Sequence, residues 1–425
     1  MNYVAYLIKA PHAPVIYDAW VCGGAIVHPE FIITSAACIE DVQFMYAIAG
    51  YKKYVNFKDI DNDPCTKASK KKIVISCVPK SYNFAYEKVT KWAYIDIGVV
   101  RVDTPYDFSL KSPLPSCSWV PRKIAINYDV KYQQPGTDTI VMGWGHDLKW
   151  RRPDDTKDYN QATLKYSPLL IQDKEKCKDF YTNIDGMDKV IEKYMICGLD
   201  EGNINSKGDQ IARSHALIDG CANNYIRVGG ICQSPQSLNI TIWPVETEKP
   251  ITPPPPKYYT PTQPPASDAP SIDNIPSDVG NGSEDDATIT FDDIAFSFRR
   301  TEMGRKLTNF SRRTGICQND HGGPLVTWVG KNEVLIGVAS VFRVSQRFDC
   351  IGPFLFTSTQ CNGAFLNCII NNMTSTRRDP VCEQPAEERG FEIVERRISW
   401  KHHPDGPAAN EHADDVFDSR YPIHY

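Results

Sequence analysis

The stretch Cys317-Gln-Asn-Asp-His-Gly-Gly-Pro324 decides how the rest of the chain is interpreted. Its glycine pair permits backbone conformations that other residues rarely adopt, and so predicts a tight turn. A cysteine at its start and an aspartate within it favour a loop that is fastened to the surrounding fold. His321 stands in the middle of this turn, where its side chain would project from the loop.

Four further motifs flank this loop in a regular order. Residues 22–38 read Cys-Gly-Gly-Ala-Ile-Val-His-Pro-Glu-Phe-Ile-Ile-Thr-Ser-Ala-Ala-Cys, so that two cysteines lie 16 positions apart. Residues 95–102 read Ile-Asp-Ile-Gly-Val-Val-Arg-Val, residues 141–145 read Val-Met-Gly-Trp-Gly, and residues 194–197 read Tyr-Met-Ile-Cys. Short β-branched and aromatic runs bounded by glycine and proline are typical of strands.

Taken together, these motifs resemble those of the chymotrypsin/trypsin-like (S1) serine peptidases, whose nucleophile loop reads Cys-Gln-Gly-Asp-Ser-Gly-Gly-Pro. The resemblance is closest to the serine protease homologues of arthropods, which keep the fold without the catalytic residues. It covers roughly residues 1–201 and 312–372. The fold that it implies is all-β, with two six-stranded antiparallel barrels, a C-terminal helix and a long insertion.

The residues that correspond to the catalytic triad have changed. In this family a serine attacks the scissile carbonyl, a histidine takes its proton and an aspartate orients the histidine. The resemblance places Ala37 at the histidine position, Asp96 at the aspartate position and His321 at the serine position. Alanine has no proton acceptor, and an imidazole at position 321 would lack an orienting partner. We therefore expect no functional catalytic residue.

Other positions that the family uses for catalysis differ as well. Asn319 replaces the glycine whose N–H lines the oxyanion hole, and we expect a non-glycine there not to reach the required backbone dihedrals. Phe342 would push a large ring into the substrate cleft, and Gly315, at the specificity position, offers no charge. Several independent requirements of catalysis therefore fail together.

Cysteine usage indicates disulfides and an oxidising compartment, because the 14 cysteines form neither a Cys-x-x-Cys pair nor a zinc-type spacing. The family resemblance implies three bridges, Cys22–Cys38, Cys177–Cys197 and Cys317–Cys350. Proximity in the sequence suggests three more, Cys65–Cys77, Cys221–Cys232 and Cys361–Cys368. Cys117 and Cys382 would then pair with each other or with residues upstream of this chain.

The domain organisation follows from the 120 positions that separate Cys197 from Cys317, far more than in the family. Residues 1–201 form the first part of the trypsin-like domain, and residues 312–375 form the remainder. Between them, residues 202–311 are an insertion whose Pro-rich and acidic composition predicts disorder. The charged tail, residues 376–425, shows no hydrophobic periodicity and is also predicted to be disordered.

Composition narrows the environment of the protein. The net charge is −5 and the Lys and Arg residues are scattered, so the charge distribution does not favour binding to nucleic acid. No apolar run approaches the roughly 20 residues that a membrane-spanning helix needs. No cofactor and no metal site are expected. Candidate N-glycosylation sites stand at Asn239, Asn281, Asn309 and Asn372. Residues 1–8 are strand-like, so we expect the export signal of a secreted protein to lie upstream of this chain.

The leading functional hypothesis is a secreted, catalytically inactive S1-fold protein that acts by binding other proteins. Its partners would be extracellular proteins such as active proteases or their substrates, and its role that of a cofactor, adaptor or decoy in a proteolytic cascade. One alternative is an unconventional hydrolase that uses His321 or a cysteine. Another is a structural extracellular protein in which the Pro/Tyr-rich insertion is the effector and the barrels are a scaffold.

Overall fold

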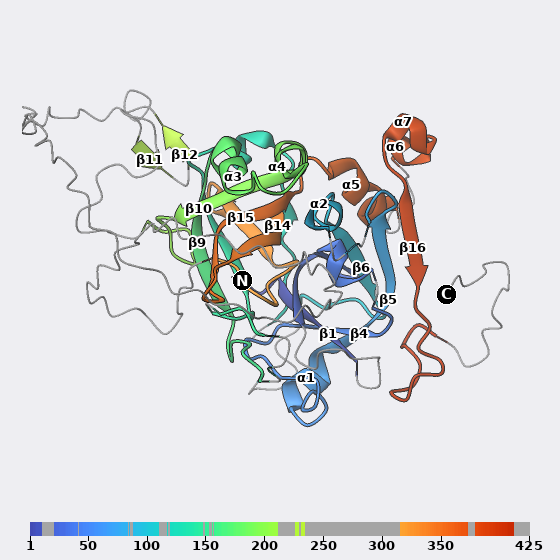
Figure 1. Ribbon diagram of the computed structural model, residues 1–425. Helices are drawn as coiled ribbons and strands as arrows, with labels where there is room; N and C mark the ends of the chain where they lie inside the picture. Colours follow the sequence, from blue (N-terminus) through green and yellow to red (C-terminus); the bar gives the residue numbers. More distant parts are fainter. Residues whose placement is uncertain are drawn as a thin grey trace, which may run out of the picture.

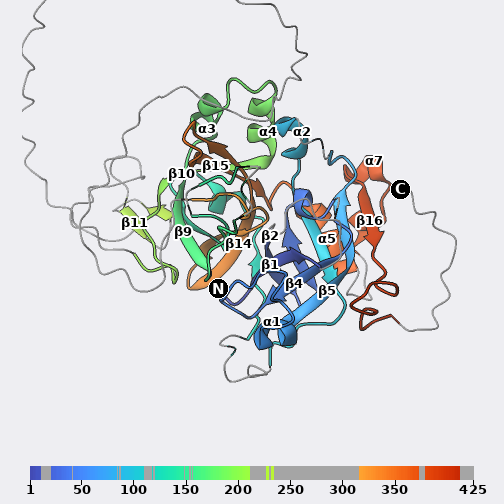
Figure 2. The same cartoon turned by 60° about the horizontal axis from the view of Figure 1, so that its bottom comes forward.

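A computed structural model describes two β-barrels that pack side by side (Figures 1 and 2). The described residues are 1–10, 21–40, 42–83, 85, 88–109, 117, 120–147, 149–152, 155, 157–210, 315–372 and 379–411, together with the backbone of 226–228 and 231–233. The predictions of disorder for most of the insertion and for the end of the tail lie outside these residues.

The first barrel closes through six strands in the order β5-β4-β1-β2-β3-β6, with β5 pairing with β6. Their bounds are β1 Val4–Lys9, β2 Val21–His28, β3 Phe31–Thr34, β4 Met45–Ala49, β5 Lys70–Pro79 and β6 Gly98–Val102. Successive residues of β1 enter two different buried clusters, as the alternation of side chains along a strand requires. Ala5 and Leu7 pack with Met45 and Val100 of this barrel, whereas Tyr6 packs with Trp144 of the second.

The second barrel closes in the order β13-β8-β9-β10-β15-β14, with β13 pairing with β14. Its strands are β8 Asp138–Gly143, β9 Lys165–Ile171, β10 Met195–Glu201, β13 Pro324–Val329, β14 Asn332–Val344 and β15 Cys350–Ser358. A short strand, β7 Ala125–Ile126, runs parallel to β14 at its edge. The predicted pair of six-stranded antiparallel barrels is confirmed. Strands on both sides of the long insertion build this second barrel.

Short helices connect and cover the barrels (Figure 1). They are η1 Ala36–Cys38, α1 Pro64–Ser69, α2 Val89–Trp92, η2 Val130–Gln133, α3 Lys174–Phe180, α4 Met187–Tyr194 and α5 Gly363–Asn372. Aspartates cap three of them. Asp63 accepts hydrogen bonds from the first N–H groups of α1, Asp129 from Lys131 of η2 and Asp173 from Glu175 of α3. The helix expected near residues 361–372 is α5. Within the insertion, β11 Ile226–Val228 pairs with β12 Ile231–Gln233.

The prediction of a disordered tail is wrong for residues 379–411. They form α6 Pro380–Glu383, α7 Ala386–Arg389 and β16 Ile393–Arg397, and β16 adds a seventh strand beside β5 (Figures 1 and 2). Trp400 is fully buried after this strand and donates a hydrogen bond of 2.8 Å to the carbonyl of Ile73. The sequence shows no alternation of apolar and polar residues that would predict this strand, because three of its five residues are exposed and charged.

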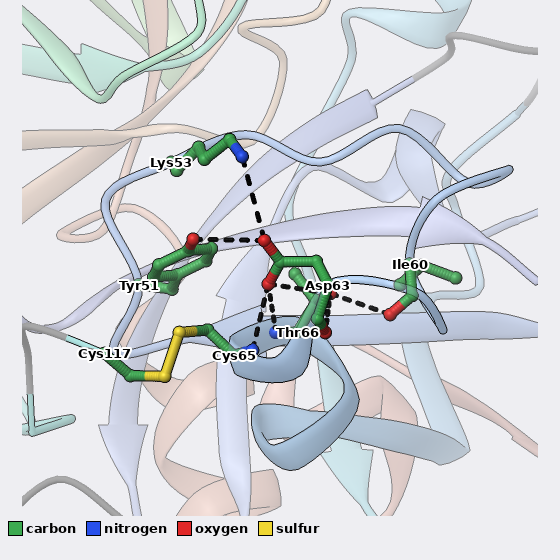
Figure 3. Close-up of a disulfide and its surroundings, with 7 residues drawn as sticks. All are labelled: Tyr51, Lys53, Ile60, Asp63, Cys65, Thr66 and Cys117. Atoms are coloured by element: carbon green, nitrogen blue, oxygen red, sulfur yellow. Dashed lines mark hydrogen bonds and ion pairs between the residues drawn. A yellow bond between two sulfur atoms is a disulfide. The ribbon is translucent and has the colours of Figure 1, made fainter. Parts of the chain in front are cut away.

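Three predicted disulfides, Cys22–Cys38, Cys177–Cys197 and Cys317–Cys350, are present. The predicted pair Cys65–Cys77 is wrong, because Cys65 is bonded to Cys117 beside the Asp63 cap of α1 (Figure 3). Cys77 lies on the extended strand β5, seven residues after its start, and β5 begins where α1 ends. Because an extended strand rises about 3.3 Å per residue, the Cys77 thiol is far from Cys65 of α1.

The pair Cys361–Cys368 is wrong too. Cys368 of α5 is bonded to Cys382 of α6, which fastens the C-terminal segment to the barrel, and Cys361 is a free, exposed thiol. The prediction for Cys117 and Cys382 is wrong as well. Each is bonded to a cysteine of this chain, and they pair neither with each other nor with a segment that would precede the chain. The prediction of Cys221–Cys232 lies outside the described residues.

Candidate functional site

The triad-equivalent residues gather around Asp96, which lies between α2 and β6 and is fully buried. Its Oδ1 accepts hydrogen bonds from Ser35 Oγ at 2.5 Å and from the backbone N–H of Ala37 at 2.9 Å. Its Oδ2 accepts one from Ser340 Oγ at 2.6 Å. Burial raises the pKa of the Asp96 carboxyl, although His321 and these donors act in the opposite direction. Three donors therefore hold a carboxylate that water does not reach.

Position 37 brings only a methyl group to this site. Ala37 lies in the 3-10 helix η1 and contributes its backbone N–H, not a side chain, to Asp96. Ser35, immediately before η1, is buried and uses its hydroxyl on the same carboxylate oxygen. The sequence analysis missed Ser35, whose role depends on a partner 61 residues away.

His321 lies close to Asp96 on the turn that immediately precedes β13. Its backbone carbonyl accepts a hydrogen bond of 2.7 Å from Gly23 of β2, which joins the two barrels. A Cβ at Gly23 would lie 2.5 Å from the Cα of Gly323, so only glycine permits this approach of the two backbones. The imidazole lies against Trp92 at 5.7 Å and Phe342 at 6.1 Å between ring centroids.

The electrostatics of His321 favour a neutral ring. The residue is partly exposed as a whole, but its Nε2 is buried and has no hydrogen-bond partner in the part of the chain that the structure describes. Burial lowers the pKa of the His321 imidazole, and the nearby carboxylates of Asp96 and Asp320 only partly offset this effect. Asp96 and His321 thus influence each other, while the hydrogen bonds of Asp96 go to serines and to the backbone.

The loop around His321 keeps its scaffold. Asp320 is buried and accepts hydrogen bonds of 3.0 Å from the backbone N–H groups of Gly145 and Cys317. Asn319 has a φ of 71°, in the left-handed region, so the expectation that it would not reach such dihedrals is wrong. Asparagine tolerates this region better than most residues, and its Nδ2 donates a hydrogen bond of 2.8 Å to Asn160.

An aromatic ring packs against the position that, by the family resemblance, sets substrate specificity. Gly315 has a φ of 101°, and a Cβ placed there would lie 2.1 Å from the ring of Phe354, which is itself 6% exposed. Phe342, as expected, brings a second ring to the cleft, next to His321. Phe354 could not be found from the sequence, because its contact with Gly315 forms only in the folded chain.

The chemistry open to this arrangement is limited. A nucleophilic serine must be reachable by its substrate, yet Ser35 and Ser340 are both fully buried and donate their hydroxyl groups to the buried carboxylate of Asp96. The His321 ring packs between two aromatic side chains and has no serine or cysteine nucleophile bonded to its Nε2 among the described residues. The site fits a packed interior better than a reaction centre.

Comparisons with known proteins agree with this fold. The family model "Trypsin" matches residues 10–209. Over this stretch, a little under half of the chain, the sequence is similar to the chymotrypsin/trypsin-like (S1) family, and the two barrels are the trypsin fold. It is 31% identical over 127 residues to snake venom serine protease 2B of Craspedocephalus gramineus, covering 30% of this chain and 39% of that protein. It is 26% identical over 140 residues to the thrombin-like enzyme flavoxobin of Protobothrops flavoviridis, covering 32% and 44%.

The matched part of this chain thus spans about two fifths of the length of those curated relatives. Among solved structures, a scabies mite inactivated protease paralogue is similar with a TM-score of 0.42 and 12% identity, over 89% of this chain and 95% of that one. No helix of the described residues is long and apolar enough to span a membrane.

Proposed function

We propose that this S1-family chain is a catalytically inactive protein that acts by binding other proteins. The observation that carries the proposal is the environment of Asp96. Its carboxylate oxygens are taken by Ser35, Ser340 and the N–H of Ala37, so no side chain relays a proton between Asp96 and position 321. Without a positioned base, nucleophilic attack on an amide loses its main acceleration.

The closed specificity position supports the same proposal. A ring packed on Gly315 leaves little room for the side chain of a substrate, whatever the state of the catalytic residues. The loop retains the buried Asp320 and its hydrogen bonds, which stabilise the fold of the loop. A loop that keeps its fold but catalyses no peptide hydrolysis can still contribute to a binding surface.

An extracellular location fits the cysteine chemistry. Five disulfides join described cysteines, and such bonds persist in oxidising compartments. The proposed role is that of a cofactor, adaptor or decoy in an extracellular proteolytic cascade, with active proteases or their substrates as partners. The glycosylation sites remain predictions: Asn372 ends α5, and the other three lie outside the described residues.

A fluorophosphonate probe for activated serines tests the inactive state, with an active trypsin-like protease as positive control. We expect no covalent labelling and no turnover of a panel of peptide esters and amides. Labelling, or turnover that disappears in the His321→Ala variant, would establish the hydrolase alternative instead. Binding is tested separately, by adding the chain to purified extracellular trypsin-like proteases and measuring complex formation and their kcat/KM. An inert chain that binds none of them would argue against the cascade role.

A further inference from the structure

A cavity of about 230 Å³ lies beside the former active-site loop and is lined by the side chains of two short loops. We call it the basic pocket and define it by Lys149, Trp150, Arg151, Arg152, Arg347 and Phe348. The hydrogen bond of 2.9 Å from the Arg151 N–H to Gln318 ties it to the loop that carries His321. None of its residues corresponds to a catalytic position.

The two loops that build the basic pocket hold each other in place. Lys149 and Asp349 form an isolated antiparallel bridge and also an ion pair. The N–H of Trp150 donates a hydrogen bond of 2.7 Å to the carbonyl of Phe348, whose φ is 60°. A bulky residue rarely adopts a positive φ, and it persists only where its surroundings constrain it. The pocket is therefore preorganised and not a chance gap between mobile side chains.

Positive charge gathers here, although the chain as a whole carries −5. Four of the lining side chains are cationic, against one lining carboxylate, Asp155. Lys149 is paired with Asp349, whereas the guanidinium groups of Arg152 and Arg347 form no ion pair with any residue that the structure describes. Both arginines are exposed, and the guanidinium carbon of Arg152 lies 4.6 Å from the centroid of the Phe348 ring, a cation–π contact.

Aromatic rings continue from the pocket toward the former cleft. Trp150 lies 5.8 Å from Phe342, Phe342 lies 6.1 Å from His321, and His321 lies 5.7 Å from Trp92, measured between ring centroids. Trp150, Phe342 and Trp92 are each only partly buried. A ligand that places anionic groups in the basic pocket would thus have apolar surface directly beside it.

We infer that the basic pocket and this row of rings bind a short peptide segment of a partner protein in which acidic and aromatic residues are interspersed. Arginine guanidinium groups recognise carboxylates in a fixed fork geometry, and the exposed rings accept apolar side chains. The cationic side chains gather at one pocket. A long polyanion would bind better to cations arranged in a row along the surface. The inference rests on the proposed binding role and names the chemistry of the partner.

The test measures fluorescence anisotropy of a labelled synthetic peptide in which Glu and Asp alternate with Tyr and Phe, added to the full chain. The test variant carries Arg152→Ala and Arg347→Ala. Its matched control carries Arg122→Ala and Arg397→Ala, which remove two exposed arginines elsewhere on the surface. We expect the test variant to bind about tenfold more weakly and the control to bind like the wild type, since each lost charged contact weakens binding by a few-fold.

Two further probes decide the nature of the ligand: a peptide of Glu and Gly with the same charge, and a sulfated oligosaccharide. We expect both to bind more weakly than the mixed peptide and to lose affinity in high salt. Equal weakening in test and control variants, equal binding of the aromatic-free peptide, or tighter binding of the sulfated probe would each overturn the inference. Thermal unfolding of each variant checks that the fold is intact. Failure here is distinct from failure of the proposed inactivity, which covalent labelling by the fluorophosphonate would reveal.

Discussion

Ser340 Oγ lies 2.6 Å from Asp96 Oδ2 and donates a hydrogen bond to it in a fully buried environment. Ser35 binds the other carboxylate oxygen, so two serine hydroxyls and one backbone N–H surround an acid that has no histidine at position 37. A buried carboxylate without such donors would be costly. The pairing explains how a buried carboxylate is accommodated at position 96 without a histidine beside it.

This network predicts opposite outcomes for two substitutions of Asp96. Asp96→Ala leaves three buried donors without an acceptor and should lower the free energy of unfolding by about 3 kcal/mol or more. Asp96→Asn can still accept from Ser35 and Ala37 and donate to Ser340, so we expect a change within about 1 kcal/mol. Urea denaturation measures both. Equal destabilisation by the two variants would mean that the charge, not hydrogen bonding, matters.

The lowered pKa of His321 predicts a dependence of stability on pH. The unfolded state takes up a proton near pH 6.5, which the buried imidazole resists, so this contribution is present above that pH and is lost as the pH falls toward the folded pKa. The difference in unfolding free energy between wild type and His321→Asn should therefore shrink on acidification below about pH 6.5. A difference that stays constant down to about pH 5 would contradict the effect of burial on this ring.

The raised pKa of Asp96 predicts the opposite slope. Its contribution is present below the unfolded value near pH 3.9 and is lost as the pH rises through the folded pKa. Relative to Asp96→Asn, the wild type should lose stability between about pH 4 and neutrality. Denaturation curves of both proteins across this range provide the measurement. If the wild type instead became more stable relative to Asp96→Asn as the pH rises, the hydrogen-bond donors would outweigh burial in their effect on the pKa of Asp96.

Placing a histidine at position 37 and a serine at position 321 tests two questions separately. One is whether the site can activate a serine, and the other is whether a peptide substrate can reach it. In the double variant Ala37→His/His321→Ser, the new histidine would stand beside Asp96, and we expect the serine to become labelled by a fluorophosphonate. Peptide turnover should remain undetectable, because the ring of Phe354 still packs on Gly315. The two single variants serve as controls and should not be labelled. Efficient turnover of any peptide by the double variant would disprove the closed pocket.

The docked C-terminal segment can be tested through Trp400 and a buried thiol. Burial raises the pKa of Cys77 to about 12, and β16 covers this residue through its pairing with Glu395. Trp400→Ala should cost about 3–5 kcal/mol and make Cys77 reactive toward maleimide, as located by peptide mass spectrometry. Exposed Cys361 should react in all variants. Val381→Ala, at a residue 39% exposed in the same segment, is the control. An unreactive Cys77 in the Trp400 variant would argue against a docked strand.

The sequence by itself indicated the trypsin-like fold and its two barrels, and through the resemblance it placed Ala37 and His321 at the positions of the triad histidine and serine. These features reside in short motifs whose residue types are tied to local geometry, such as the glycine pair of residues 322–323 or the cysteines 16 positions apart. Three disulfides followed from the same resemblance. The conformation of Asn319 did not, because asparagine adopts left-handed backbone more readily than the general rule for non-glycine residues allows.

Only the tertiary structure decided the contacts between distant segments. Cys65 found Cys117 across 52 residues, Ser35 and Ser340 met on Asp96, and Phe354 closed the space at Gly315. The strand β16 has mostly charged residues, and it is stabilised by backbone pairing with β5 and by the burial of Trp400 against Phe44 and Tyr46. Backbone pairing and burial by a remote partner leave no periodic signal in the sequence, which is why these features required the folded chain.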